Sequence, residues 1–172
     1  MPGYQKRRKE NDKFSRLKVF STDKVCYRIV SAGHDPLSTN GSLLYHGRYN
    51  NGRFLVLYAA TSEKVCSEEQ KRKTTVNVKG AYKRAKLEVK LKKVIDLTDE
   101  KNLAVIDVKK EDLICDEWTI TQHIANMAYQ KGIEALIVPS ATGKGENIVM
   151  FTENFTNSTS VKKIDEKEIR VS

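Results

Sequence analysis

Five polar side chains lie inside or beside the most apolar segments of this sequence, and their types suit chemistry. Two are arginines, one in a β-prone run and one in a glycine-rich loop, and the others are a tyrosine, a glutamate and a serine: Arg28, Arg48, Tyr58, Glu69 and Ser140. Guanidinium groups bind phosphate oxygens through paired hydrogen bonds. A carboxylate can act as a base or stabilise a developing positive charge. Together these groups would suit an anionic small molecule.

Each of these residues also has an ordinary structural explanation. Arg28 fits a charge on an edge strand, and Tyr58 fits a core aromatic residue. Glu69 fits a solvated helix position, and Ser140 fits a turn. Taken singly, the structural explanation is the better one for every residue, so only their ordered combination points to a site.

Other motifs in the chain fail the test of spacing. The loop that begins at Ser140 lacks the GxxxxGK[ST] pattern and precedes a strand, so the helix N-terminus that would bind phosphate is missing. The histidines and cysteines show no HExxH, HxH or CxxC pattern: His34, His46, His123, Cys26, Cys66 and Cys115. We therefore expect no metal site and reduced thiols.

The hydrophobic pattern predicts the elements that position these residues. Residues 18–31 divide into two β-prone runs around 21–24, and the second run, 25–30, is the stronger strand candidate. Four later strands are expected at 54–60, 85–97, 133–138 and 148–152, and an edge strand in the tail at 161–171. A long polar loop is expected at 33–53. Helices are expected at 62–73 and 116–131, and a short helix or turn around 99–114. Thr61 or Ser62 can cap the first of these helices, and Gly132 ends the last.

The length of 172 residues and the 39% hydrophobic content favour one packed domain. The pattern predicts an α+β fold with a mixed β-sheet core and flanking helices. Residues 1–17 are expected to form a basic, flexible segment, frayed or a short helix, and 18–172 the folded domain.

The net charge is +9, and residues 1–18 carry five of these units. A second basic stretch spans 71–93. A basic nucleic-acid-binding module is therefore one hypothesis, and a steep loss of affinity with salt would identify it. Neither stretch has interleaved aromatic residues, so a solvated surface is the better interpretation. No apolar run approaches a membrane span and no secretory signal is present, which predicts a cytoplasmic protein.

Several short segments occur in a specific order between Tyr27 and Glu153. They are Tyr27-Arg28-Ile-Val, Gly47-Arg48-Tyr49-Asn50-Asn-Gly, Leu57-Tyr58-Ala-Ala, a helix with Glu69, Trp118, Thr121-Gln122-His-Ile-Ala, Gly132-Ile and Val138-Pro139-Ser140-Ala. In this order the sequence resembles the RES-domain family, the toxins of RES–Xre toxin–antitoxin pairs. The family usually has Trp where this chain has Tyr49. Glu68 adjoins Glu69, and the spacing from Tyr58 favours Glu69 as the family glutamate.

The resemblance implies a fold related to ADP-ribosyltransferases and an enzyme that consumes NAD as its substrate, without a prosthetic group. Arg28 and Arg48 would then bind the pyrophosphate. The ring of Tyr58 or Tyr27 would stack on the cationic nicotinamide. Asn50 belongs to the same substrate-binding motif.

Glu69, Arg28 and Ser140 are the expected catalytic residues. Glu69 would bind the ribose hydroxyls, stabilise the oxocarbenium-like charge and orient a nucleophile. Ser140 would donate a hydrogen bond to the ribose or to a phosphate. These roles are implied by the resemblance.

The function that follows is cleavage of the nicotinamide–ribose bond by hydrolysis or phosphorolysis, which depletes NAD and arrests growth. The alternatives are a protein ADP-ribosyltransferase and a non-catalytic interaction protein that kept the fold. The expected partner is an Xre-type antitoxin, with nucleic acid contacted only through it. The sequence leaves the acceptor of ADP-ribose and a homodimeric state open.

Overall fold

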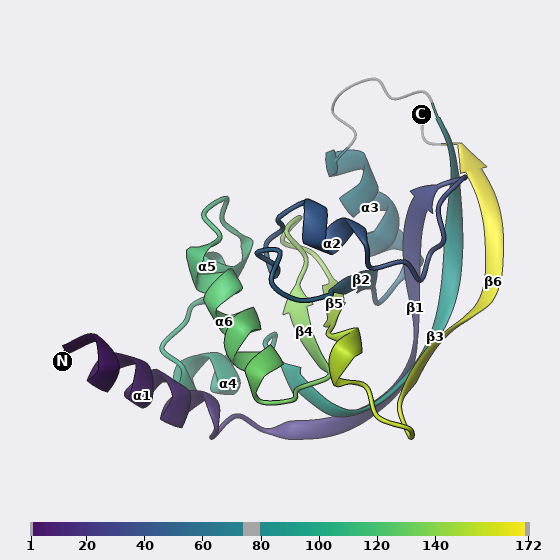
Figure 1. The fold of residues 1–172 in the computed structure, drawn as a ribbon. Coiled ribbons are helices and arrows are strands. Elements are labelled where there is room, and N and C mark those ends of the chain that lie inside the picture. Colours follow the sequence, from purple (N-terminus) through teal and green to yellow (C-terminus); the bar gives the residue numbers. More distant parts are fainter. Residues whose placement is uncertain (1, 74–79, 171–172) are drawn as a thin grey trace.

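The structure is a computed structural model that describes residues 2–73 and 80–170 (Figure 1). Its strands are β1 (Val19–Ser31), β2 (Leu57–Ala60), β3 (Ala81–Asp96), β4 (Ala135–Pro139), β5 (Glu146–Met150) and β6 (Ser160–Arg170). Its helices are α1 (Pro2–Phe14), α2 (Gly41–Leu44), α3 (Glu63–Lys73), α4 (Glu100–Val105), α5 (Lys110–Ile114) and α6 (Thr119–Gln130), with a 3₁₀ turn at Thr152–Asn154.

The strands form one mixed sheet in the order β1-β2-β5-β4-β3-β6. The β3–β4 pair is parallel, and the other pairs are antiparallel. Strand β1 also pairs with β3, so the pairings close a ring of five strands and leave β6 outside it on β3. In Figure 1 the long strands β1 and β3 curve around one side, and α4, α5 and α6 gather on the other. The expected α+β domain with a mixed sheet and flanking helices is confirmed.

The neighbouring strands β4 and β5 are buried on both faces, as the apolar runs in their sequences predict. Leu136 and Val138 of β4 pack into a helix-side core with Ile124 of α6. Ala135 and Ile137, which alternate with them, pack into a strand-side core with residues of β1, β2 and β3. Successive side chains of a strand point to opposite faces, so one short strand supports both cores.

The N-terminal half of β1 differs from the sequence-based expectation. The polar residues 21–24 predicted a break between two runs, but β1 is one strand from Val19 to Ser31. It pairs with β3 almost throughout, with one irregularity between Phe20 and Thr22. Backbone hydrogen bonds to β3 thus override the weak strand preference of the polar residues.

The expected strand at 54–60 is shorter than its apolar sequence indicates, because regular pairing begins only at Leu57. Phe54 and Val56 are buried without strand pairing. The backbone N–H of Leu55 donates to Glu153 Oε1 at 2.7 Å, and that of Val56 donates to Ser42 Oγ at 3.0 Å. Side chains thus satisfy donors that a neighbouring strand would otherwise satisfy.

Residues 1–17, expected to be flexible or a short helix, contain α1, and the end of this segment joins the core. Phe14 and Leu17 are 2% and 5% exposed and belong to the helix-side core. Lys131 donates from Nζ to Ser15 Oγ at 2.7 Å, which adds a polar contact. The rest of α1 is largely exposed and projects from the body (Figure 1).

The second basic stretch is partly neutralised on the surface. Lys83 of β3 pairs with Glu166 of β6 at 3.5 Å, and Arg84 pairs with Glu63 of α3 at 3.3 Å. Residues 74–79 of this stretch lie outside the described residues. Among the helices of the described chain, none is long and apolar enough to cross a membrane.

The burial of Phe14 predicts that the first 17 residues contribute to stability. Phe14→Ala should lower the free energy of unfolding by about 3–5 kcal/mol, because it removes a buried ring and leaves a cavity. Urea denaturation would measure this loss. Tyr4→Ala is the control, since Tyr4 is 69% exposed on the same helix and should change stability by less than about 0.5 kcal/mol. Equal urea midpoints for the two variants would show that residues 1–17 do not contribute to stability.

Candidate active site

A pocket of about 630 Å³ lies between β1, the loop before β2, α3, and the ends of β4 and β5. Its size is in the range of small-molecule sites. Six of the seven side chains expected from the sequence line it: Tyr27, Arg28, Arg48, Asn50, Tyr58 and Glu69. The seventh, Ser140, is fully buried behind them.

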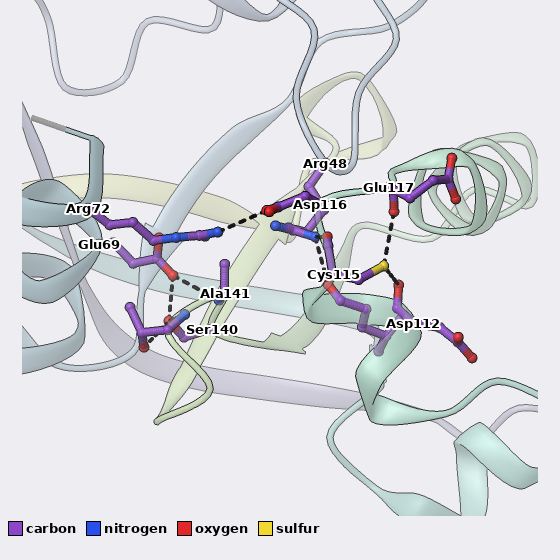
Figure 2. Close-up of polar contacts among 11 residues, drawn as sticks. Arg48, Glu69, Arg72, Asp112, Cys115, Asp116, Glu117, Ser140 and Ala141 are labelled. Atoms are coloured by element: carbon purple, nitrogen blue, oxygen red, sulfur yellow. Dashed lines mark hydrogen bonds and ion pairs between the residues drawn. The ribbon is translucent and has the colours of Figure 1, made fainter. Parts of the chain in front are cut away.

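Glu69 is held through one carboxylate oxygen by three donors. Its Oε1 accepts hydrogen bonds from the hydroxyl of Ser140, from the backbone N–H of Ala141 at 3.0 Å and from Asn147 Nδ2 at 3.1 Å. Figure 2 shows Glu69 reaching from α3 to Ser140 and Ala141. Within the part of the chain that the structure describes, Oε2 accepts no hydrogen bond. One oxygen therefore fixes the side chain, and the other has no donor among the described residues.

The helix that carries Glu69 forms for local reasons. Ser62 Oγ accepts a hydrogen bond from the N–H of Val65 at 3.2 Å, as expected of an N-cap residue. The first turn has Glu63, and the last turn has three cations, which suits the helix macrodipole. Glu68, the alternative glutamate, does not line the pocket formed by the described residues.

The turn between β4 and β5 brings two of the donors, Ser140 and Ala141, to Glu69, and Asn147 of β5 supplies the third. Gly145 has φ +77°, and a Cβ there would lie 2.2 Å from Cγ2 of Val65 on α3. A glycine at this position therefore lets the turn pack directly on the helix. The glycine-rich segment is a hairpin loop, as its sequence predicts, and its role is to place a carboxylate.

Ser140 contacts Glu69, which differs from the expected contact with a ribose or phosphate. Its side chain is 0% exposed, and its Oγ also lies 2.8 Å from Thr142 Oγ1. The hydroxyl is thus enclosed by protein groups and orients the glutamate.

Asn147 is a site residue that sequence reasoning missed. It lies on β5, lines the pocket and donates to Glu69. The one available signal was a polar residue at the start of an otherwise apolar strand. Its partner lies 78 residues earlier in the chain, so the contact itself has no local signature.

Arg28 is a largely buried guanidinium whose hydrogen bonds go to neutral carbonyls. It donates to the carbonyl oxygens of Tyr58 at 3.1 Å and Ser38 at 3.4 Å. Burial lowers the pKa of Arg28 below its ordinary value, and nearby Cys66 and Asp35 partly oppose this. An arginine nevertheless stays protonated at neutral pH, so Arg28 presents a fixed positive charge to the pocket.

Arg48 is anchored in a similar way at the other side of the loop. Its Nη1 donates to the carbonyl oxygens of Leu113 at 3.3 Å and of Cys115. Its guanidinium also lies 5.9 Å from the centroid of the Trp118 ring, within cation–π range. Figure 2 shows it directed toward the segment between α5 and α6.

Asn50 and Tyr58 organise the loop that carries Arg48. Asn50 is 2% exposed, and its Nδ2 donates to the carbonyls of Ser42 and Tyr45, each at 2.9 Å. Tyr58 donates its hydroxyl to Asn50 Oδ1 at 2.5 Å and accepts the N–H of Tyr49 at 3.0 Å. Burial raises the pKa of Tyr58, which keeps this hydroxyl protonated as a donor. The polar atoms of Asn50 are thus engaged inside the protein.

Two further features bear on the chemistry of the pocket. Burial raises the pKa of the Cys66 thiol, which lines the pocket, to about 11, so it is not a thiolate at neutral pH. Among residues 2–73 and 80–170, no cluster of three or more His, Cys, Asp or Glu side chains could hold a metal ion. The groups at hand are one anchored carboxylate, anchored guanidinium groups and tyrosine rings.

Comparison with known proteins gives a match to a family and to named relatives. A model of the RES domain matches residues 25–171. The chain is 29% identical over 129 residues to proteins named NAD(+) phosphorylase MbcT from Mycobacterium tuberculosis and Mycobacterium bovis. The alignment covers 70% of this chain and 69% of each relative.

A solved structure has the same fold. It is the crystal structure of the M. tuberculosis MbcT–MbcA toxin–antitoxin complex, with a TM-score of 0.84 and 20% sequence identity. The match covers 94% of this chain and 92% of that chain, so it includes nearly the whole architecture.

The contact of Gly145 with α3 predicts a specific loss of stability. Gly145→Ala should lower the free energy of unfolding by about 1–3 kcal/mol more than Gly143→Ala, because only the first variant forces atoms together. The two glycines have φ of +77° and +78°, but a Cβ at Gly143 would meet no atom within 4 Å. Urea denaturation of both variants isolates the steric effect. Equal losses would mean that the turn does not press on the helix.

Proposed function

Because this chain belongs to the RES domain family, we propose that it is an enzyme that cleaves the nicotinamide–ribose bond of NAD. The anchored carboxylate of Glu69, which lines the pocket and keeps one oxygen without a donor among the described residues, is the observation that carries this proposal. The relatives named as NAD(+) phosphorylases support it. Loss of NAD would arrest growth, which is the activity of a toxin.

The proposed chemistry uses Glu69 at the ribose. Departure of nicotinamide gives the ribose an oxocarbenium-like positive charge, as in glycoside cleavage. A fixed carboxylate stabilises that charge without reorganising during the reaction. Its second oxygen can also accept hydrogen bonds from ribose hydroxyls and orient the nucleophile.

The remaining pocket residues divide into two roles. Arg28 and Arg48 bind the pyrophosphate, and Tyr27 or Tyr58 stacks on the nicotinamide. Asn50 and Ser140 act indirectly, because their polar groups are bonded to the loop and to Glu69. The two arginines suit a dianionic bridge because their neutral carbonyl partners orient them without cancelling their charge.

We further propose the wider setting of this activity. The fold is related to that of ADP-ribosyltransferases, and the enzyme acts in the cytoplasm with an Xre-type antitoxin as its partner. Nucleic acid is then contacted only through the antitoxin, and the enzyme itself is a monomer or a homodimer. The solved complex of the structural relative with MbcA supports an antitoxin partner.

Tyr49 stands where the family usually has tryptophan, but this difference does not favour a non-catalytic protein. Tyr49 is 2% exposed and belongs to the helix-side core, where its hydroxyl has no partner among the described residues. Tyr49 also lines the pocket, so the replacement changes packing at its wall, while Arg28, Arg48 and Glu69 are retained.

The proposal predicts that purified protein releases nicotinamide from NAD. Glu69→Gln should lower kcat roughly 10²- to 10⁴-fold, because it removes the charge that stabilises the oxocarbenium-like state. Nicotinamide release, followed by chromatography with and without phosphate, measures the rates. NMR of the products distinguishes ADP-ribose, its phosphate ester and ADP-ribosylated protein.

Glu68→Gln is the matched control, since Glu68 is adjacent on α3 and should retain activity. Intact NAD after long incubation with the wild-type protein would refute the enzymatic function. Activity lost in Glu68→Gln but kept in Glu69→Gln would transfer the catalytic role to Glu68.

Asn147 should act through Glu69. Asn147→Ala removes one of three donors to a charged oxygen, so kcat should fall roughly 10- to 100-fold with little change in KM for NAD. Steady-state kinetics together with thermal unfolding separates this effect from misfolding. Asn157→Ala, at an exposed turn, is the control. An unchanged kcat in Asn147→Ala would mean that the other two donors suffice.

A further inference from the structure

Arg72 is a pocket residue that the proposed chemistry has not yet used. It lies three residues after Glu69 on α3, and both side chains line the pocket. Residues three apart on a helix are neighbours on one face, with Cβ atoms about 5–6 Å apart. Arg72 therefore extends into the pocket from the same face of α3 as Glu69, the carboxylate that would orient a nucleophile.

The partner of Arg72 differs in kind from those of Arg28 and Arg48. Its Nη2 lies 3.2 Å from Oδ1 of Asp116, which belongs to the segment before α6 and also lines the pocket (Figure 2). Arg28 and Arg48 instead donate to backbone carbonyl oxygens, which are fixed by the fold and carry no charge. Arg72 is thus paired with a side-chain carboxylate, which an anion from solution can replace.

The exposure of the pair indicates that such an exchange is easy. The side chains of Arg72 and Asp116 are 42% and 94% exposed. Ion pairs this exposed contribute little to stability, so breaking one costs little. A guanidinium binds phosphate in the same forked geometry as it binds a carboxylate.

We infer that Arg72 binds the inorganic phosphate that accepts ADP-ribose, and that Asp116 occupies this position until phosphate arrives. This inference rests on the proposed cleavage of NAD. A phosphate dianion close to the Glu69 carboxylate is repelled by it, and the positive charge one helical turn away offsets this repulsion. Arg72 then decides how often phosphate, rather than water, is the nucleophile.

The step balances without any further reactant. The bond between the ribose carbon and the nicotinamide nitrogen breaks, and its electron pair leaves with neutral nicotinamide. A phosphate oxygen supplies the electron pair of the new carbon–oxygen bond. The products are nicotinamide and ADP-ribose 1″-phosphate, which keeps the phosphate proton or releases it to solvent.

The test measures KM for inorganic phosphate and the ratio of ADP-ribose 1″-phosphate to ADP-ribose by ³¹P NMR. Arg72→Gln should raise KM for phosphate roughly 10- to 100-fold and shift the products toward ADP-ribose. Asp116→Asn should act in the opposite direction and lower KM for phosphate up to about 5-fold, because the competing carboxylate is gone. Arg53→Gln, an exposed arginine outside the pocket lining, is the control and should match the wild type.

The outcomes separate this inference from the proposed function. Absence of nicotinamide release by the wild-type protein refutes the proposed function itself. Nicotinamide release with an unchanged phosphate KM and product ratio in Arg72→Gln overturns the phosphate site. Wild-type protein that forms only ADP-ribose at high phosphate overturns it as well, while NAD cleavage stands. If Arg72→Gln fails to fold, an unchanged phosphate KM in Asp116→Asn gives the same negative answer.

Discussion

The pocket depends on three hydrogen bonds to a single oxygen of Glu69. They join α3 to the β4–β5 hairpin, whose donors lie more than 70 residues further along the chain. A carboxylate makes stronger hydrogen bonds than a neutral acceptor, so these contacts fix both the side chain and the turn. The close packing of Gly145 on Val65 allows this geometry, because any side chain at that glycine would keep the turn away from the helix.

The arginines of the pocket are oriented by two kinds of partner. Arg28 and Arg48 are oriented by carbonyl oxygens, which hold a guanidinium without neutralising it. Arg72 is instead paired with the exposed carboxylate of Asp116, which we infer gives way to phosphate. In the proposed function, the pocket therefore combines two fixed arginines for the dinucleotide with one arginine for the acceptor. The net charge of +9, much of it on the exposed surface of α1 and β3, has little part in this arrangement.

The rigidity of the site comes from the centre of the sheet. β4 is buried on both faces and ends at Pro139, immediately before the serine that holds Glu69. β5 is its antiparallel neighbour and carries Asn147 opposite Val138. Groups at the ends of strands packed between two cores have few ways to move, so their distances to Glu69 are well determined. The core extends to Phe14 and Leu17, which lie outside the segment that matches the family.

The sequence by itself determined the order of the arginines, the glutamate and the serine, the helix that carries Glu69, and the doubly buried β4. These follow from local patterns, because alternation and helical spacing report which faces are buried. Only the tertiary structure decided that Ser140 bonds to Glu69, that Asn147 and Arg72 belong to the pocket, and that β1 is continuous while residues 54–56 are not a strand. Each of these depends on strand register and on side-chain contacts between residues far apart in the chain. Local preferences contain no information about such contacts, because distant partners are brought together only when the whole core packs.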